Sequence, residues 1–135
     1  MAIQRYRTDQ ELDMRENCAA TAVDQVITVI NERFRERLTV EEMARSVRYS
    51  RGHLTREFRR VTGMTPARFL QAVRIREARK LLLTSSLGVR EVAARVGYSS
   101  AGTFSATFKD TVGLPPSRYR ALVLGSGVSP PAGRR

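Results

Sequence analysis

The chain contains an internal repeat, which constrains its fold more than any other feature. Residues 40–50 match residues 89–99 at an offset of 49, and residues 54–69 match residues 104–119 at an offset of 50. The one-residue insertion falls in a predicted turn, where an added residue costs least. Two copies of one supersecondary unit are therefore expected. The clearest matches pair Val40 with Val89, Ala44 with Ala93, Tyr49 with Tyr98, Phe58 with Phe108, Gly63 with Gly113 and Pro66 with Pro116.

Each copy has the pattern of two short helices joined by a turn. In the first copy, Thr39 and Glu42 form a capping-box pattern before one helix, and Ser50 is a good N-cap for the next. Gly63 is placed to end that second helix. This is the helix-turn-helix arrangement, whose second helix is offered to a groove of DNA. A plain helical bundle is the alternative, because it uses the same apolar pattern.

Apolar residues at helical spacing predict seven helices in all. Pro66 suits the first turn of a long helix, and Thr65 suits the cap before it. The predicted helices cover residues 22–37, 40–47, 51–62, 66–83, 89–96, 100–112 and 116–122. The side chains expected to face the core include Val23, Val26, Ile27, Ile30, Phe34, Leu54, Phe58, Val61, Leu70, Val73, Ile75, Ala78, Leu81 and Leu82.

The predicted fold is all-α and homeodomain-like, with two helix-turn-helix subdomains joined by a long linker helix. The residues before Cys18 are so polar that we expect a weakly ordered arm, although Thr8 and Glu11 form a possible capping box. The Gly-, Ser- and Pro-rich end of the chain is expected to be disordered. The expected divisions are an arm at 1–20, a first subdomain at 21–64, the linker helix at 65–84, a second subdomain at 85–123 and a tail at 124–135.

The positive charge of the chain lies where the helices are predicted. The net charge is +11, and residues 45–109 hold 14 Lys and Arg against three acids. The first 20 residues hold three Arg against four acids. This distribution indicates a binding surface for a polyanion rather than a basic tail. Only Lys80 and Lys109 are lysines, so nearly all basic groups are guanidinium groups, which suit phosphates and guanine edges.

Composition argues against several other classes of protein. No stretch approaches the roughly 18 apolar residues of a membrane span, and the charged N-terminus lacks a signal-peptide core, so we expect a cytoplasmic, nucleoid-associated protein. With one cysteine and one histidine, no metal site and no cofactor are expected. Cys18 is expected to be a small buried hydrophobe rather than a redox sensor. No nucleophile with a base, no paired carboxylates in a plausible pocket and no phosphate loop appear, so an enzyme is not expected.

Three segments of the second copy carry a family resemblance. They are Arg95-Val-Gly-Tyr-Ser-Ser, Thr103-Phe-Ser-Ala-Thr-Phe-Lys and Gly113-Leu-Pro-Pro-Ser-Arg-Tyr-Arg. These segments resemble the second-unit signature of the AraC/XylS family of bacterial transcription regulators. The resemblance runs from about Asp24 to Leu122 and is strongest to small members that are little more than the DNA-binding domain. It implies seven helices in two subdomains, with the third and sixth helices reading adjacent major grooves on one face of the duplex.

The first reading helix is expected to begin at Arg51 and to carry most of the sequence specificity. Its candidate base contacts are Arg51, Gly52, Thr55 and Arg56. Arg56 is the main candidate, because a guanidinium can bond both O6 and N7 of guanine. Thr55 suits a hydroxyl contact or a thymine methyl. Gly52 stands where one of the small members of the family has a bulky aromatic residue.

Other residues near this helix are expected to contact the DNA backbone. Ser50, Arg59 and Arg60 are the candidate phosphate contacts, which supply affinity and register without sequence information. Arg51 also suits this role, and each of these arginines could instead be only a solvated charge. For His53 we expect packing or capping rather than a base contact.

The second reading helix has smaller side chains at the corresponding positions. Its candidate base contacts are Ala101, Gly102 and Ser105, in place of the amide or arginine side chains often seen there in the family. We therefore expect asymmetric reading, in which the second unit supplies mostly positioning and shape readout. Its candidate phosphate contacts are Ser100, Thr103, Thr107 and Lys109.

The function expected from these features is sequence-specific binding of double-stranded DNA by a transcription regulator, with activation as the expected effect. RNA polymerase, through its alpha C-terminal domain or sigma factor, is the expected second partner. Only about 20 residues precede the first predicted helix, which leaves no room for a small-molecule effector domain. The chain is then a stand-alone regulator or a DNA-binding fragment of a larger one. The alternative function is a module that binds RNA polymerase or another regulator, with weak DNA specificity.

Overall fold

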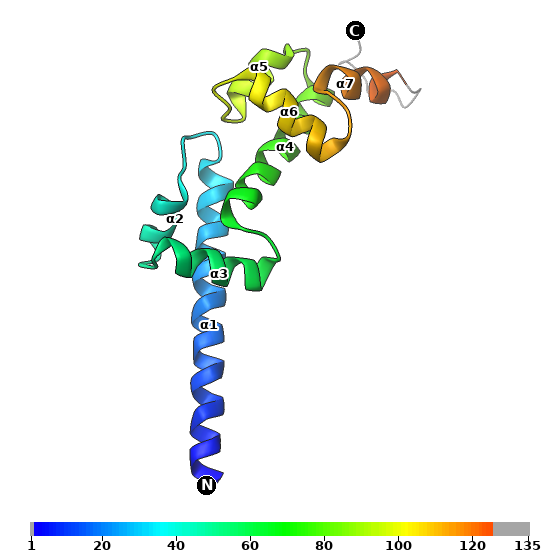
Figure 1. The fold of residues 1–135 in the computed structure, drawn as a ribbon. Coiled ribbons are helices and arrows are strands. Elements are labelled where there is room, and N and C mark those ends of the chain that lie inside the picture. Colours follow the sequence, from blue (N-terminus) through cyan, green and yellow to red (C-terminus); the bar gives the residue numbers. More distant parts are fainter. Residues whose placement is uncertain (1, 126–135) are drawn as a thin grey trace. The chain divides into compact units, whose positions relative to one another are not determined.

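The computed structural model describes the backbone of residues 2–125, and the side chains of Met14 and of residues 17–125. Within this part the chain forms seven helices and no strand (Figure 1). The predicted all-α fold is therefore confirmed. The helices are α1 (Ala2–Arg33), α2 (Val40–Ser46), α3 (Arg51–Thr62), α4 (Pro66–Thr84), α5 (Val89–Arg95), α6 (Ala101–Val112) and α7 (Pro116–Leu124).

The chain divides into two compact units, and each contains one copy of the repeat. Unit 1 comprises the residues up to Glu32 together with Leu38–Phe69, and it contains α2 and α3. Unit 2 comprises Arg33–Arg37 together with the chain from Leu70 onwards, and it contains α5, α6 and α7. The division falls inside α4, so the predicted linker helix contributes residues to both units.

The core of unit 1 is built from three helices. The α2 helix packs against α3, and the fully buried Leu54 and Phe58 of α3 face inward. Phe69, at the end of the unit, meets the ring of Phe58 edge-on, with centroids 5.4 Å apart at 82°. Each such buried side chain stabilises the fold by roughly 1.5–3 kcal/mol relative to an exposed one. The other buried apolar residues of the unit include Ala19, Ala22, Val23, Val26, Ile30, Leu38, Met43 and Ala44.

The core of unit 2 repeats this arrangement in space. Phe108 is fully buried and meets Tyr119 with centroids 5.4 Å apart at 68°, as Phe58 meets Phe69 in unit 1. The α6 helix packs against both α5 and α7. The repeat in the sequence is therefore a repeat in three dimensions. The other buried apolar residues of the unit are Phe34, Leu70, Val73, Ile75, Ala78, Leu82, Val92, Ala93, Val96, Phe104 and Leu124.

The first helix differs from its prediction at both ends. It begins at Ala2 rather than near residue 22, so the backbone of the predicted weakly ordered arm is helical. The Thr8 pattern therefore lies inside the helix and does not start it. Glycine and proline are absent before Gly52, and the arm contains good helix formers such as Gln, Glu, Arg and Met, which need no apolar period to be helical. The helix ends at Arg33 rather than residue 37.

Two single residues were also placed wrongly, one in the core and one in the tail. Val61 was expected to face inward, but it is 42% exposed. Leu124 was expected to belong to the disordered tail, but it is the last residue of α7 and is buried, because its apolar side chain completes the core of unit 2. The rest of the predicted disordered tail, residues 126–135, lies outside the described residues.

Candidate nucleic-acid interface

The helix-turn-helix of unit 1 begins with the two predicted caps. The hydroxyl of Thr39 accepts a hydrogen bond from the backbone N–H of Glu42 at 3.1 Å, and the Glu42 carboxylate accepts one from the Thr39 N–H at 3.1 Å. At the start of α3, the Ser50 hydroxyl accepts from the backbone N–H of His53 at 3.0 Å. The Ser50 O–H keeps its own hydrogen, which remains able to bind a phosphate oxygen. These caps fix where α2 and α3 begin.

The exposed side of α3 carries unpaired guanidinium groups. Leu54 and Phe58 are buried on one side of the helix, while Gly52, Arg56 and Arg59 are exposed. Among the described residues, no acid pairs with Arg56 or Arg59, whereas other arginines of the unit do have acidic partners. A Cβ on Gly52 would lie 3.5 Å from Nη1 of Arg56, so the guanidinium lies at contact distance from the place that a side chain at this position would take.

Two other predicted contact residues of α3 are held by carboxylates. Nη1 of Arg51 donates to Oε2 of Glu41 at 2.9 Å, across the turn between α2 and α3. Arg60 pairs with Glu57 one turn earlier on the same helix, at 3.0 Å. Thr55, also a predicted contact, is half-buried, and its hydroxyl donates to the Arg51 carbonyl oxygen at 2.9 Å. Its hydroxyl oxygen still has a lone pair to accept a bond from a base.

His53 lies against the turn rather than projecting freely. Its ring stacks on that of Tyr49, with centroids 4.0 Å apart and an angle of 11° between the planes. The side chain is nevertheless exposed. This contact is the kind of packing expected for His53 from the sequence, and it holds the turn against the first turn of α3.

The second helix-turn-helix has the same construction with smaller side chains. The Ser100 hydroxyl caps α6 by accepting from the Thr103 N–H at 3.2 Å. Gly102, Thr103 and Lys109 are exposed, and no acid pairs with Lys109 among the described residues. Ala101, Ser105 and Thr107 are half-buried. The exposed surface of α6 therefore offers one cation, Lys109, one acid, Asp110, and otherwise short neutral side chains.

Thr107 is a half-buried predicted contact that lies near a buried tyrosine hydroxyl. It faces Tyr98, a residue whose hydroxyl is buried. Burial raises the pKa of Tyr98, and the nearby guanidinium of Arg74 and the Thr107 hydroxyl act against this rise. The Tyr98 ring also contacts Phe104, with centroids 5.4 Å apart. Thr107 is thus placed at the edge of the core as well as near the exposed surface of α6.

The turns of the two units differ at one matched position. Arg48 has φ of 61°, and Gly97, its counterpart in the repeat, has φ of 103°. Both residues are in the left-handed region, which favours glycine over a residue with a Cβ. Arg48 is exposed. The first unit thus adds an exposed arginine in the turn before α3, next to the four exposed arginines of α3, at a conformational cost.

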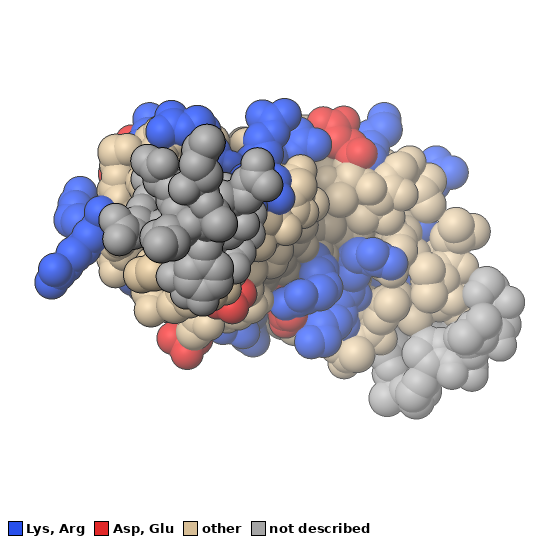
Figure 2. Space-filling view, turned by 90° about the horizontal axis from the view of Figure 1, so that it is seen from below, with Lys and Arg blue, Asp and Glu red and all other residues tan. Residues whose placement is uncertain are grey.

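Basic side chains outnumber acidic ones on the face of the molecule that Figure 2 shows. In this view Lys and Arg side chains reach the surface in several groups, and Asp and Glu side chains in fewer. Among the described residues, no group of three or more His, Cys, Asp or Glu side chains is placed to hold a metal ion. In the same part of the chain, no helix is long and apolar enough to cross a membrane.

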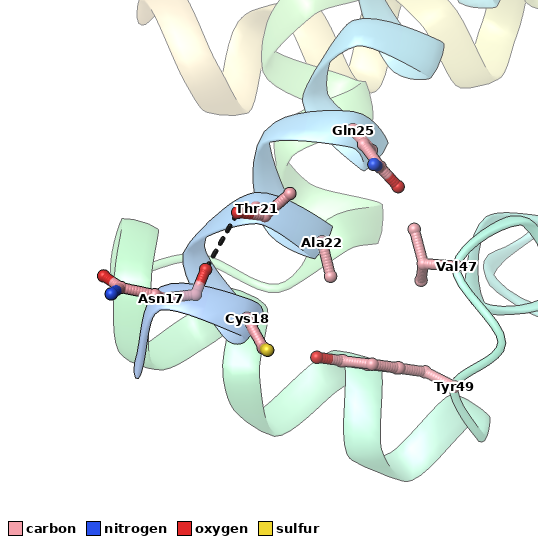
Figure 3. Close-up of a pocket in the computed structure, with 7 residues that line it drawn as sticks. All are labelled: Asn17, Cys18, Thr21, Ala22, Gln25, Val47 and Tyr49. Carbon is pink, nitrogen blue, oxygen red and sulfur yellow. Dashed lines mark hydrogen bonds between the residues drawn. The ribbon is translucent and has the colours of Figure 1, made fainter. Parts of the chain in front are cut away.

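A pocket of about 380 Å³ lies in unit 1 between α1 and the turn before α3. The thiol of Cys18 and the hydroxyl of Tyr49 point toward each other across it (Figure 3). Cys18 is exposed, so its predicted burial as a small hydrophobe is wrong. The reason is that the neighbouring Ala19 and Ala22, and not Cys18, turn toward the core.

Sequence reasoning missed three residues that shape the site. Glu41 was assigned no role at the site, and its pairing with Arg51 spans ten residues, beyond any helical period. Tyr49 was recognised as a repeat match but not as the support of His53. Arg48 carried a readable signal, because the repeat aligns it with Gly97, a residue that often marks a left-handed turn.

Comparison with known proteins assigns this arrangement to a family. The model of a helix-turn-helix domain family matches residues 43–122. The activator AarP of Providencia stuartii is 31% identical over 101 residues, which cover 75% of each chain. A solved regulator from Chromobacterium violaceum, described as having an AraC-type DNA-binding domain, is 25% identical with a TM-score of 0.71, over 76% of this chain and 92% of that one. The chain belongs to the AraC family of transcription regulators.

Two further members connect this AraC-family chain to DNA and to larger proteins. The DNA-binding domain of AdpA, solved in complex with a target DNA, has 32% identity and a TM-score of 0.74, over 78% of this chain and 95% of that one. The transcriptional activator and DNA repair enzyme AdaA of Bacillus subtilis is 32% identical over 74% of this chain, but the match spans only 47% of AdaA. The matched part is thus the helix-turn-helix region, and several relatives are much longer proteins.

Proposed function

We propose that this chain is a transcription activator that binds double-stranded DNA sequence-specifically, with α3 reading bases and α6 mainly holding the duplex. The observation that carries the proposal is the difference between two matched helices. At the positions where α3 exposes Arg56 and Arg59, α6 has Ala106 and Lys109. A guanidinium can bond two acceptors on one guanine, whereas an alanine reads at most a methyl group.

In unit 1 the base contacts would come from Arg56, Arg51, Gly52 and Thr55. Arg56 has no acidic partner to give up among the described residues, and the missing side chain at Gly52 lets a base edge come close to it. The phosphate contacts would come from Arg59, Arg60 and the Ser50 hydroxyl, which flank this surface at the N-terminus and along the helix. Phosphate contacts of this kind set register and affinity.

In unit 2 the contacts would be shorter and less specific. Lys109 supplies a charge for the backbone, and the Ser100 and Thr103 hydroxyls lie at the start of α6. Thr107 would contribute only from the edge of the helix, because it is half-buried. The candidate base contacts Ala101, Gly102 and Ser105 allow a close approach of the duplex rather than a bidentate bond.

RNA polymerase is the second partner that we propose, through its alpha C-terminal domain or sigma factor, in the cytoplasm at the nucleoid. Leu122 is the residue that we expect such a contact to bury, because it is a large apolar side chain on α7 that is 62% exposed. Tight polymerase binding combined with DNA binding that lacks sequence preference would favour the interaction module over the DNA reader.

Selection of binding sites from random DNA tests the proposal. We expect the wild-type chain to yield a site with at least one strongly preferred guanine. Arg56→Ala should weaken binding to that site by about 1–3 kcal/mol and relax one position. Arg59→Ala, the matched control on the same helix, should weaken all sequences alike and make the salt dependence shallower by about one phosphate contact. Equal behaviour of the two variants would contradict the assignment.

A further inference from the structure

The ion pair between Glu41 and Arg51 joins the two helices of the first helix-turn-helix. Nη1 of Arg51 is 2.9 Å from Oε2 of Glu41, and both side chains are more than half exposed. Exposed ion pairs contribute little to the stability of a fold. Stability alone therefore does not account for an acid at this place.

The carboxylate of Glu41 stands next to the N-terminus of the helix that would meet DNA. A negative charge there repels phosphates and weakens binding to every sequence. In the first turn of α2 it also interacts favourably with the helix dipole, but the adjacent Glu42 already supplies a carboxylate there and forms the capping box. Glu41 thus lowers the affinity for DNA, and the stability of α2 does not depend on it.

The geometry of the pair leaves the useful edge of Arg51 free. A guanidinium is planar and carries five N–H donors in a fixed arrangement. The bond to Glu41 uses Nη1, which leaves the edge formed by Nε and Nη2, with two parallel donors. Two parallel donors are what O6 and N7 of guanine accept. An arginine held through Nη1 is therefore oriented in advance for a base edge.

The second unit supplies a natural comparison. The repeat aligns Glu41 with Arg90 and Arg51 with Ala101, so unit 2 lacks both members of the pair. Arg90 is exposed, as a residue that only adds positive charge would be. The acid thus occurs in the copy that has an arginine to orient, and a cation replaces it in the copy that has none.

We propose that Glu41 is a positioning residue that sets the base specificity of Arg51, at the cost of some affinity for DNA in general. By holding Nη1, it keeps Arg51 from swinging to a nearby phosphate and presents the Nε–Nη2 edge to the groove. This proposal rests on the proposed function, in which Arg51 contacts a base.

The test measures two affinities for each variant: that for the selected site and that for the same site with one guanine replaced. Glu41→Gln should tighten binding to unrelated DNA by about twofold, because an acid is lost. It should also lower discrimination at one guanine by about two- to fivefold, the range that an exposed ion pair can supply. Glu36→Gln is the matched control, since Glu36 is an exposed acid paired with Arg33 at 3.0 Å in the other unit. It should leave discrimination unchanged.

Glu41→Asp separates positioning from charge. The aspartate keeps the negative charge and the acid in the first turn of α2, but its carboxylate lies one methylene farther from Arg51. We expect unchanged affinity for unrelated DNA and a loss of discrimination close to that of Glu41→Gln. If Glu41→Asp discriminates like the wild type while Glu41→Gln does not, the effect is one of net charge and the proposal is overturned.

Combining Glu41→Gln with Arg51→Ala completes a double-mutant cycle. In the Arg51→Ala background, Glu41→Gln should have no further effect on discrimination, because the residue through which Glu41 acts is gone. An equal loss of discrimination in both backgrounds overturns the proposal. If Arg51→Ala alone leaves the base preference of the wild type intact, the base contact assigned to Arg51 is wrong. Absence of any base preference in the wild type would instead contradict the proposed function as a whole.

Discussion

Arg74 and Phe34 are joined by a hydrogen bond of 2.8 Å, from Nε of the arginine to the carbonyl oxygen of the phenylalanine, 40 positions apart in the chain. Nη2 of the same arginine donates to the carbonyl oxygen of Glu36 at 2.8 Å. The side chain is half-buried, and this burial lowers the pKa of Arg74 from its usual value. These bonds attach the segment after α1 to the rest of unit 2.

Arg74→Ala should destabilise the protein, because two backbone carbonyls would lose a charged donor. Hydrogen bonds to charged groups are worth about 1.5–3 kcal/mol, so we expect the free energy of unfolding to fall by about 2–3 kcal/mol in urea titrations. Arg90→Ala is the control, since Arg90 is an exposed arginine of the same unit, and it should change stability by less than about 0.5 kcal/mol. Similar losses of unfolding free energy in the two variants would show that the Arg74 hydrogen bonds do not stabilise the fold.

Gly97→Ala should be among the most damaging small substitutions in the chain. A Cβ at this position would lie 2.6 Å from the Phe34 carbonyl oxygen, and the residue has a φ of 103°. Gly63→Ala is the matched control, because Gly63 has a φ of 81° but nothing within 4 Å of its Cβ position. We expect a loss of about 1–2 kcal/mol for Gly63→Ala from the backbone alone, and a clearly larger loss for Gly97→Ala in thermal unfolding. Equal losses would contradict the predicted overlap with Phe34.

Arg48→Gly should stabilise the protein, which is unusual for a substitution that removes a large side chain. Arg48 holds a φ of 61° at the position where unit 2 has a glycine. Relief of the left-handed strain, about 1–2 kcal/mol, exceeds the added entropy of glycine in the unfolded chain, about 0.5–1 kcal/mol. The expected gain in unfolding free energy is therefore about 0.5 kcal/mol, measured by chemical denaturation. A loss of stability would mean that the Arg48 side chain makes a contact that outweighs its strain.

The raised pKa of Tyr98 predicts a loss of stability at alkaline pH. Burial favours the neutral phenol in the folded protein, so its folded pKa lies above the unfolded value near 10. The stability that this provides is present below pH 10 and is lost as pH rises through the folded pKa. Tyr98→Phe should remove this part of the alkaline decline in urea titrations between pH 8 and pH 11. An unchanged slope above pH 10 in Tyr98→Phe would contradict the assignment.

The repeated part of the fold was predictable from the sequence because its signals are local. The Thr39–Glu42 capping box, the Ser50 cap and the helix-ending Gly63 all act within four residues, and each has the predicted geometry. The apolar period of α4 likewise placed Leu70 and Leu82 in the core. Local hydrogen bonds and helical periods are read directly from neighbouring residues.

The features that escaped prediction depend on long-range contacts or on the lack of an apolar period. The N-terminal part of α1 lacks apolar residues at regular helical spacing, so apolar periodicity does not predict a helix there. The place of Arg33–Arg37 in unit 2 depends on Arg74, far along the chain. At the site, the exposed arginines of α3 were predictable. The ion pair between Glu41 and Arg51 was not, because it joins two helices across a turn.

The central claim is that unit 1 makes the base contacts that give sequence specificity, whereas unit 2 mainly contacts the DNA backbone. Its most direct test is the affinity of the wild-type chain, of Arg56→Ala and of Ser105→Ala for every single-base variant of the selected site, at one salt concentration. We predict that Arg56→Ala abolishes a penalty of about 1–3 kcal/mol at one guanine, while Ser105→Ala leaves the pattern of penalties as it is in the wild type. The claim would be contradicted if Arg56→Ala kept the wild-type losses of affinity at every base change and Ser105→Ala removed some of them.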